Sequence, residues 1–123
     1  MRKSMFETAR IVAMSSEYKF RHGAILVRGP SIIKISANKS RAVNIFNDYH
    51  KNNRASLHAE IGCILNLRKE VTRGCDIYVC RILANNLFAC SDPCEMCQTI
   101  CAEMGIRKIF YTVEENVFDW IRL

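Results

Sequence analysis

Two short motifs constrain the fold of this chain more than any other feature of its sequence. They are His58-Ala59-Glu60 and Pro93-Cys94-Glu95-Met96-Cys97, and a long stretch of chain separates them. One imidazole and two thiolates can hold a zinc ion and leave its fourth position open. The Glu60 carboxylate then stays free to move protons for a metal-activated water. A fold that uses both motifs must therefore bring them together.

The Cys-x-x-Cys pair also has a structural interpretation. Alone, such a pair is more often a structural zinc half-site or a redox pair than part of a catalytic site. A closed structural site needs a fourth protein ligand, and Cys63, Cys90 and Cys101 are available for that place. We expect packing, core or ordinary polar roles for the remaining cysteines and histidines, which are Cys63, Cys75, Cys80, Cys90, Cys101, His22 and His50.

The two motif cysteines are expected at the start of a helix. Asp92 can cap this helix with Pro93 at its first position, and Gly105 can end it. Cys94 and Cys97 then lie one turn apart on the same side. The helix dipole at this end favours the thiolate, which is the form of cysteine that binds metal.

His58 is expected in the first turn of its own helix, over about residues 57–69 with Ser56 as the N-cap. On an ideal helix, a side chain two positions further on points about 200° away. His58 and Glu60 can therefore converge on one site only if that site lies beyond the end of the helix.

Hydrophobic periodicity predicts strands that alternate with helices. A first helix is expected over residues 2–16, followed by a hairpin of strands over 23–28 and 31–37. The other expected elements are a strand over 75–83, a turn at 85–86, a strand over 106–113 and a short docking helix within 114–123. This order favours an α/β sheet covered on both faces. The length of 123 residues suits one domain over the whole chain, 1–123.

Positive charge gathers before the first motif. The net charge is +6, and residues 1–54 carry eleven Lys/Arg against three Asp/Glu, whereas residues 55–123 carry seven against nine. A basic lobe beside a pocket suits a phosphate-bearing substrate, and a solvated basic surface is the alternative. Residues 38–56 are polar and irregular, which is typical of a functional or disordered loop.

The composition favours a cytoplasmic location without a membrane partner. No apolar run approaches the roughly 18 residues that a membrane span needs. The charged N-terminus lacks the apolar stretch of a signal peptide. The seven cysteines are an odd number, so we interpret them as buried residues and metal ligands in a reducing compartment and not as a disulfide framework.

The two motifs in this strand and helix context resemble the cytidine deaminase superfamily, and within it the branch with a His ligand. That branch includes deoxycytidylate deaminases, tRNA adenosine deaminases, and small deaminase-like proteins of viruses and phages. The resemblance covers most of the chain. It implies a three-layer α/β/α sandwich with a mixed sheet and a shortened C-terminus. It also implies a Zn²⁺ cofactor held by His58, Cys94 and Cys97, with Glu60 as the catalytic proton shuttle.

The resemblance implies substrate contacts as well. Ala59 matches a position whose backbone N–H contacts the base, and Ser91 lies where the chain passes the leaving amine. Asn38 matches an Asn that contacts the sugar, although an Asn after a strand is also a common turn residue. Arg41 and Lys39 are candidates for binding a phosphate.

Three functions remain open at this point. The first is hydrolytic deamination of cytosine in a nucleoside or nucleotide, with a deoxycytidylate-like substrate expected. The second is deamination of a polynucleotide, either tRNA adenosine or single-stranded cytosine, with Phe46 and Tyr49 available for base stacking. The third is a non-catalytic zinc-binding assembly module, against which Glu60 argues because a structural zinc does not need it. Relatives commonly assemble, so a homo-oligomer is expected.

Overall fold

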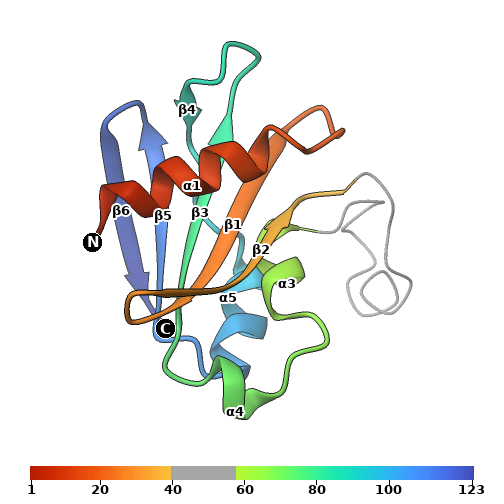
Figure 1. The fold of residues 1–123 in the computed structure, drawn as a ribbon, viewed down its shortest axis with the longest axis vertical. Helices are drawn as coiled ribbons and strands as arrows, with labels where there is room; N and C mark the ends of the chain where they lie inside the picture. The colour runs from red at the N-terminus through yellow and green to blue at the C-terminus, as the bar shows by residue number, and fades with distance from the viewer. Residues whose placement is uncertain (40–57) are drawn as a thin grey trace.

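The structure is a computed structural model that describes residues 1–39 and 58–123. Its strands form one six-stranded sheet with helices around it (Figure 1). The elements in chain order are α1 (Lys3–Ala13), β1 (Arg21–Arg28), β2 (Ser31–Ala37), α3 (Ala59–Ile64), α4 (Lys69–Thr72), β3 (Asp76–Ile82), β4 (Phe88–Ala89), α5 (Glu95–Glu103), β5 (Lys108–Glu114) and β6 (Val117–Arg122). Within the described ranges, no helix is long and apolar enough to span a membrane.

The sheet is mixed, as the family resemblance implies. Its strand order is β2-β1-β3-β5-β6, and the short β4 pairs with β3 off this path. Strands β3 and β5 are parallel because α5 carries the chain from one to the other, and the remaining pairs are antiparallel. The hairpin of β1 and β2 is confirmed, with Gly29 in the left-handed region at φ 55°.

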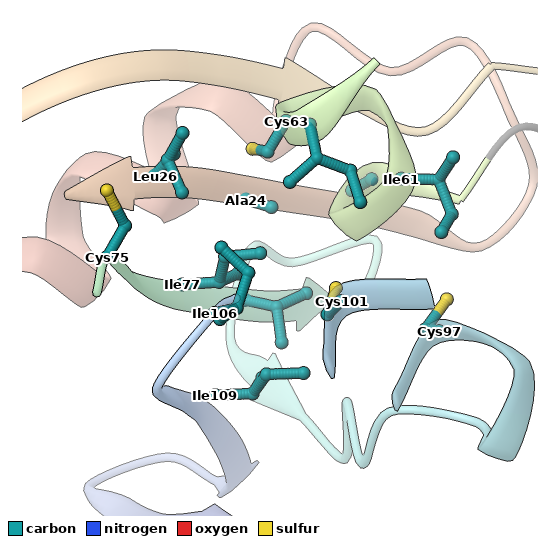
Figure 2. Packing of buried hydrophobic residues seen from close by; sticks show 13 residues of the cluster. Ala24, Leu26, Ile61, Cys63, Cys75, Ile77, Cys97, Cys101, Ile106 and Ile109 are labelled. Atoms are coloured by element: carbon teal, nitrogen blue, oxygen red, sulfur yellow. The ribbon is translucent and has the colours of Figure 1, made fainter. Parts of the chain in front are cut away.

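Two apolar clusters cover the two faces of the sheet and make three layers. Alternation along β3 sends Ile77 and Val79 to one face and Tyr78 and Cys80 to the other. The first face packs against α3 and α5, and Figure 2 shows this cluster with Cys97 at its edge. The second face packs against α1, where Phe6 is fully buried. The predicted α/β/α sandwich is confirmed.

The helix predicted over 57–69 is shorter than expected. Its N-cap is His58 and it ends at Ile64, while Ser56 lies outside the described residues. Asn66 adopts a left-handed φ of 66°, which breaks the helical path before the separate helix α4 begins. At Gly62, an added Cβ would lie 1.9 Å from the Ser36 Oγ. The glycine therefore lets α3 approach β2 closely.

The helix of the cysteine motif also begins later than predicted. Cys94 is its N-cap, with an extended ψ of 163°, and neither Asp92 nor Pro93 belongs to it. The first helical hydrogen bond runs from the Gln98 N–H to the Cys94 carbonyl at 3.0 Å. Gly105 has φ 79° just after the helix, as expected for a helix stop.

The docking helix predicted within 114–123 is wrong. Val117–Arg122 of this segment form β6, which pairs antiparallel with β5. Asn116 has φ 64°, so the chain reverses in a tight turn and returns alongside β5. β-branched and aromatic residues suit a strand better than a short helix. Phe118 stacks on Phe6 of α1 at 4.3 Å between ring centroids, which anchors the new strand.

Candidate active site

His58 lies just outside the helix that carries Glu60. Its backbone is extended, with φ −65° and ψ 145°, and Ala59 is the first helical residue of α3. The prediction that His58 occupies the first helical turn is therefore wrong in detail. Because His58 is not helical, the 200° separation of an ideal helix does not apply to it. Both side chains line one cavity, so the condition that the site lies beyond the helix end is met.

The two motifs meet at three side chains. The ligand atoms of His58, Cys94 and Cys97 all lie within 4.8 Å of one another. The His58 Nδ1 is 3.2 Å from the Cys97 Sγ and 3.6 Å from the Cys94 Sγ. His58 stands at the start of α3 and Cys94 at the start of α5, so the approach of two helix ends builds the group.

The two thiols differ in acidity. A hydrogen bond from the Cys97 thiol, together with His58, lowers the pKa of Cys94 to about 4. That same hydrogen bond and burial raise the pKa of Cys97 well above its usual value. Hydrogen bonding to Cys94 also raises the pKa of His58. One thiolate is thus ready at neutral pH, and Cys97 and His58 must lose protons before they bind metal.

The donor set fits a zinc ion with an open position. Two sulfurs and one imidazole nitrogen are typical zinc ligands. Across residues 1–39 and 58–123, no further His, Cys, Asp or Glu joins this group. Burial raises the pKa of Cys63 and of Cys101, which keeps both as thiols within the core. In this part of the chain, the fourth ligand that a closed structural site requires is missing.

Zinc affinity is expected to rise with pH between about pH 6 and 8. Cys94 is already ionised in this range, whereas Cys97 keeps its proton until zinc displaces it. Because zinc binding releases that proton, the affinity for zinc should rise about tenfold for each pH unit. His58, whose pKa is raised, adds a further proton at the acidic end. Competition with a chelator, corrected for the chelator's own titration, measures this. An affinity that stays constant across the range would contradict it.

Glu60 lies beside these three groups without joining them. Its side chain is buried, with 5% exposure, and it lines the same cavity as His58 and Cys94. Burial raises its pKa, because a charged carboxylate loses its hydration there. A carboxyl group whose pKa is moved toward neutrality is well suited to accept and return a proton.

The cavity in front of these groups has a volume of about 320 Å³. This is at the lower end of the usual range for pockets that hold one small molecule, roughly 300–1,000 Å³. His58, Cys94 and Glu60 line it together with residues from β1, β3 and the segment before α5, while Cys97 is buried behind them. The remaining lining residues are Tyr18, Phe20, His22, Asn38, Ala59, Arg81, Cys90, Ser91 and Asp92.

Comparison with known proteins places the chain in a family. The sequence model of the cytidine and deoxycytidylate deaminase zinc-binding region matches residues 2–113. The chain belongs to this deaminase family. The family model describes a zinc-binding region, so the predicted Zn²⁺ cofactor is confirmed, with His58, Cys94 and Cys97 as its possible site. No curated protein matches the chain in sequence.

Solved deaminase structures share the fold. The cytidine deaminase of Burkholderia pseudomallei superposes with a TM-score of 0.66 at 15% identity, over 99% of this chain and 92% of that chain. The apo dCMP deaminase of cyanophage S-TIM5 gives 0.62 at 21% identity, over 90% and 81%. The same phage enzyme in complex with dCMP and dUMP gives 0.57 at 18% identity, over 95% and 87%.

Asn38 lines the cavity that contains Glu60, but its side-chain amide already forms three hydrogen bonds within the protein. Its Oδ1 accepts hydrogen bonds from the His22 N–H at 2.8 Å and the Ser16 hydroxyl at 2.7 Å. Its Nδ2 donates to the Phe20 carbonyl at 2.6 Å. Asn38 therefore ties the end of β2 to the segment that enters β1. One Nδ2 hydrogen remains for a ligand, so the sugar contact stays a prediction with Asn38 as a single donor.

Ser91 likewise uses its hydroxyl within the protein. Its Oγ lies 3.0 Å from the Val79 carbonyl and 2.8 Å from the Thr112 Oγ1, and it accepts the Thr112 N–H at 2.9 Å. Thr112 in turn donates to the Ala89 carbonyl. This buried hydroxyl pair fixes the segment that leads from β4 into the cysteine motif. The Ser91 N–H also donates to the Thr112 carbonyl at 2.9 Å, so a substrate contact at Ser91 would come from its own carbonyl.

The remaining predicted residues divide between the deaminase cavity and other places. Ala59 is buried and lines the cavity, and Arg41 lies outside the described residues. Lys39 lines a different cavity of about 670 Å³ along β2. Cys90, expected to be a packing residue, is exposed and lines the cavity that contains Glu60.

Sequence reasoning missed two cavity residues on the strands, His22 and Arg81. They pair across β1 and β3, and both line the cavity that contains Glu60. Strand alternation could have predicted the place of Arg81, because it follows Ile77 and Val79 at intervals of two and so lies on the same face of the sheet. The register between the strands, which places His22 opposite, could not be read from one sequence.

Proposed function

We propose that this chain is a zinc-dependent hydrolytic deaminase that converts cytosine of a free nucleoside or nucleotide, of the deoxycytidylate kind, into uracil. The supporting observation is the convergence of His58, Cys94 and Cys97, together with a cavity that His58, Cys94 and the buried Glu60 line. Family membership supports the reaction class. The cavity volume of about 320 Å³ supports a substrate the size of one nucleotide. The phage relative that holds dCMP and dUMP supports the same substrate class.

In this proposal, the imidazole of His58 and the sulfurs of Cys94 and Cys97 hold zinc. A zinc ion with three protein ligands supplies an activated water as the nucleophile. Cys94 and Cys97 stand at the N-terminal end of α5, whose backbone N–H groups favour the thiolate charge.

Glu60 moves the protons of the reaction. Its carboxylate takes one proton from the attacking water and gives it to N3 of the cytosine ring. It then carries the second water proton to the departing amino group on C4, which leaves as ammonia. Water and cytosine are consumed, and uracil and ammonia are formed. The apolar burial that raises the pKa of Glu60 helps the carboxyl to hold the proton between these transfers.

Backbone groups orient the base in the proposed complex. Ala59 is the first residue of α3, so its N–H has no acceptor within the helix and is available to the base. The Ser91 hydroxyl and N–H are both held by β3 and β5, which leaves the Ser91 carbonyl to accept from the leaving amine. The closed contacts around Ser91 and Asn38 support a preformed pocket.

Turnover of a substrate panel by the zinc-loaded full chain tests the proposal. We expect ammonia release from deoxycytidylate or related free cytosine compounds, and less from tRNA or single-stranded oligonucleotides. Faster turnover of a polynucleotide, with a steep loss of rate as salt rises, would favour the polynucleotide alternative. No turnover of any member by folded, zinc-loaded protein would favour the non-catalytic module.

A further inference from the structure

Arg81 lies on the same face of the sheet as the zinc-binding side chains. Along β3, Ile77 and Val79 point into the cluster under α3 and α5, and Arg81 is the next residue on that face. Strand β3 runs parallel to β5, so Arg81 stands near the carboxyl end of the parallel pair. Ligands of open α/β sheets bind at this end. The cavity lining includes Arg81 together with Glu60.

The guanidinium of Arg81 has no partner among the described residues. Two other arginines are half-buried, and both use their guanidinium groups within the protein. Arg10 bonds Glu7 and Glu115, and Arg21 bonds Asn86. For Arg81, residues 1–39 and 58–123 supply only the ring of Phe20, whose centroid lies 5.3 Å from its Cζ. Stacking on an aromatic ring orients the guanidinium plane and leaves its N–H donors open.

Arg81 is the cavity residue whose charge suits it to bind an anion. Among the described lining residues, Glu60 and Asp92 are acidic and Arg81 is the permanent cation. His22 faces Arg81 across the strands, and burial lowers its pKa, so it is neutral near pH 7. Glu60 belongs to the zinc end of the cavity. A guanidinium fork with open donors matches a phosphate.

We propose that Arg81 binds the phosphate of a cytosine mononucleotide and so makes the chain prefer a nucleotide to the corresponding nucleoside. This inference rests on the proposed deaminase function. It assigns phosphate recognition to β3, whereas the sequence suggested Lys39 and Arg41. Lys39 lines the separate cavity along β2. The Phe20 ring keeps the guanidinium at the cavity wall.

Substrate preference in an Arg81→Gln variant tests this assignment. We expect kcat/KM for deoxycytidine 5′-monophosphate to fall about 10- to 100-fold, the range for a lost hydrogen-bonded charge contact. Turnover of deoxycytidine, which has no phosphate, should change less than about threefold. Arg81→Lys should lose less than Arg81→Gln, because it keeps the positive charge but not the paired N–H donors of the guanidinium. Arg122→Gln, an exposed arginine on the edge strand β6, is the matched control and should leave both substrates unchanged.

An equal change for both substrates, or none for either, would overturn the role of Arg81. The role would also be overturned if the wild-type enzyme prefers an oligonucleotide with one internal cytosine to the mononucleotide, and if the Arg81→Gln variant lacks that preference. If the wild-type chain turns over no cytosine compound, the proposed function fails separately. Calorimetric binding of the two compounds to zinc-loaded wild type and Arg81→Gln then still decides the inference. The inference is supported if the wild type binds the nucleotide more tightly than the nucleoside and Arg81→Gln does not. It is refuted if the wild type binds both compounds with equal affinity.

Discussion

Glu60→Gln is expected to lower kcat for deamination by about 10²- to 10⁴-fold while the protein keeps its zinc. This is the usual range for loss of a positioned acid–base group. The amide has nearly the same shape as the carboxyl but cannot carry a proton between water, ring and amine. Steady-state ammonia release and metal analysis of the same preparation measure the two effects together.

The stability of the Glu60→Gln variant carries a second expectation. The folded-state pKa of Glu60 is raised by burial, so a charged carboxylate at neutral pH costs the folded state free energy. A neutral amide removes that cost, and Tm should stay equal or rise. Glu103→Gln, at the exposed end of α5, is a control that should alter neither activity nor Tm. Full activity in Glu60→Gln would remove Glu60 from the chemistry, and loss of zinc would make it a ligand.

Cys97→Ala is expected to abolish stable zinc binding and turnover. Loss of outer-shell partners of a metal ligand already costs about 10- to 100-fold in metal affinity, so loss of a ligand itself should cost at least about 100-fold. The Cys97 Sγ lies 3.2 Å from the His58 Nδ1, and both belong to the three-ligand group. Competition with a chelator measures the affinity.

Cys101→Ala is the matched control for Cys97→Ala. Both cysteines are fully buried on α5 and pack in the same cluster, so in the zinc-free protein both changes should cost similar stability, on the order of 1 kcal/mol. Only Cys97→Ala should lose zinc. Zinc loss in Cys101→Ala at unchanged fold would indicate a closed site with Cys101 as its fourth ligand, and the structural interpretation would then hold.

The sequence was sufficient for the elements whose signals are local. Gly29-Pro30 between two apolar runs predicted the hairpin, and Gly105 marked the end of α5. The two motifs predicted the zinc group, because His, Cys and Glu at those spacings together suit few sites besides a catalytic zinc centre. The alternation of strands and helices predicted an α/β sheet covered on both faces, and the family resemblance implied the mixed, three-layer form.

The missed features depend on contacts between distant segments. β6 is a strand because Phe118 reaches Phe6 on α1 and because β5 offers a free edge. Its β-branched and aromatic residues favour a strand, but the segment is short and the prediction assigned its apolar residues to one face of a docking helix. His58 and Cys94 are the N-caps of α3 and α5, at the point where these two helix ends meet around the site. Local cap preferences had pointed to Ser56 and Asp92 instead. The place of Arg81 in the cavity needed the register of β1 against β3.

An open fourth position on zinc distinguishes a catalytic site from a structural one. X-ray absorption at the zinc edge of the zinc-loaded full chain measures the ligand set directly. Binding by His58, Cys94 and Cys97 predicts two sulfurs at about 2.3 Å and two lighter atoms at about 2.0–2.1 Å, one of them from the imidazole and the other from solvent. Addition of a cytosine nucleotide should perturb the light-atom shell. Three or four sulfurs on zinc, unchanged by nucleotide, would contradict an open catalytic site.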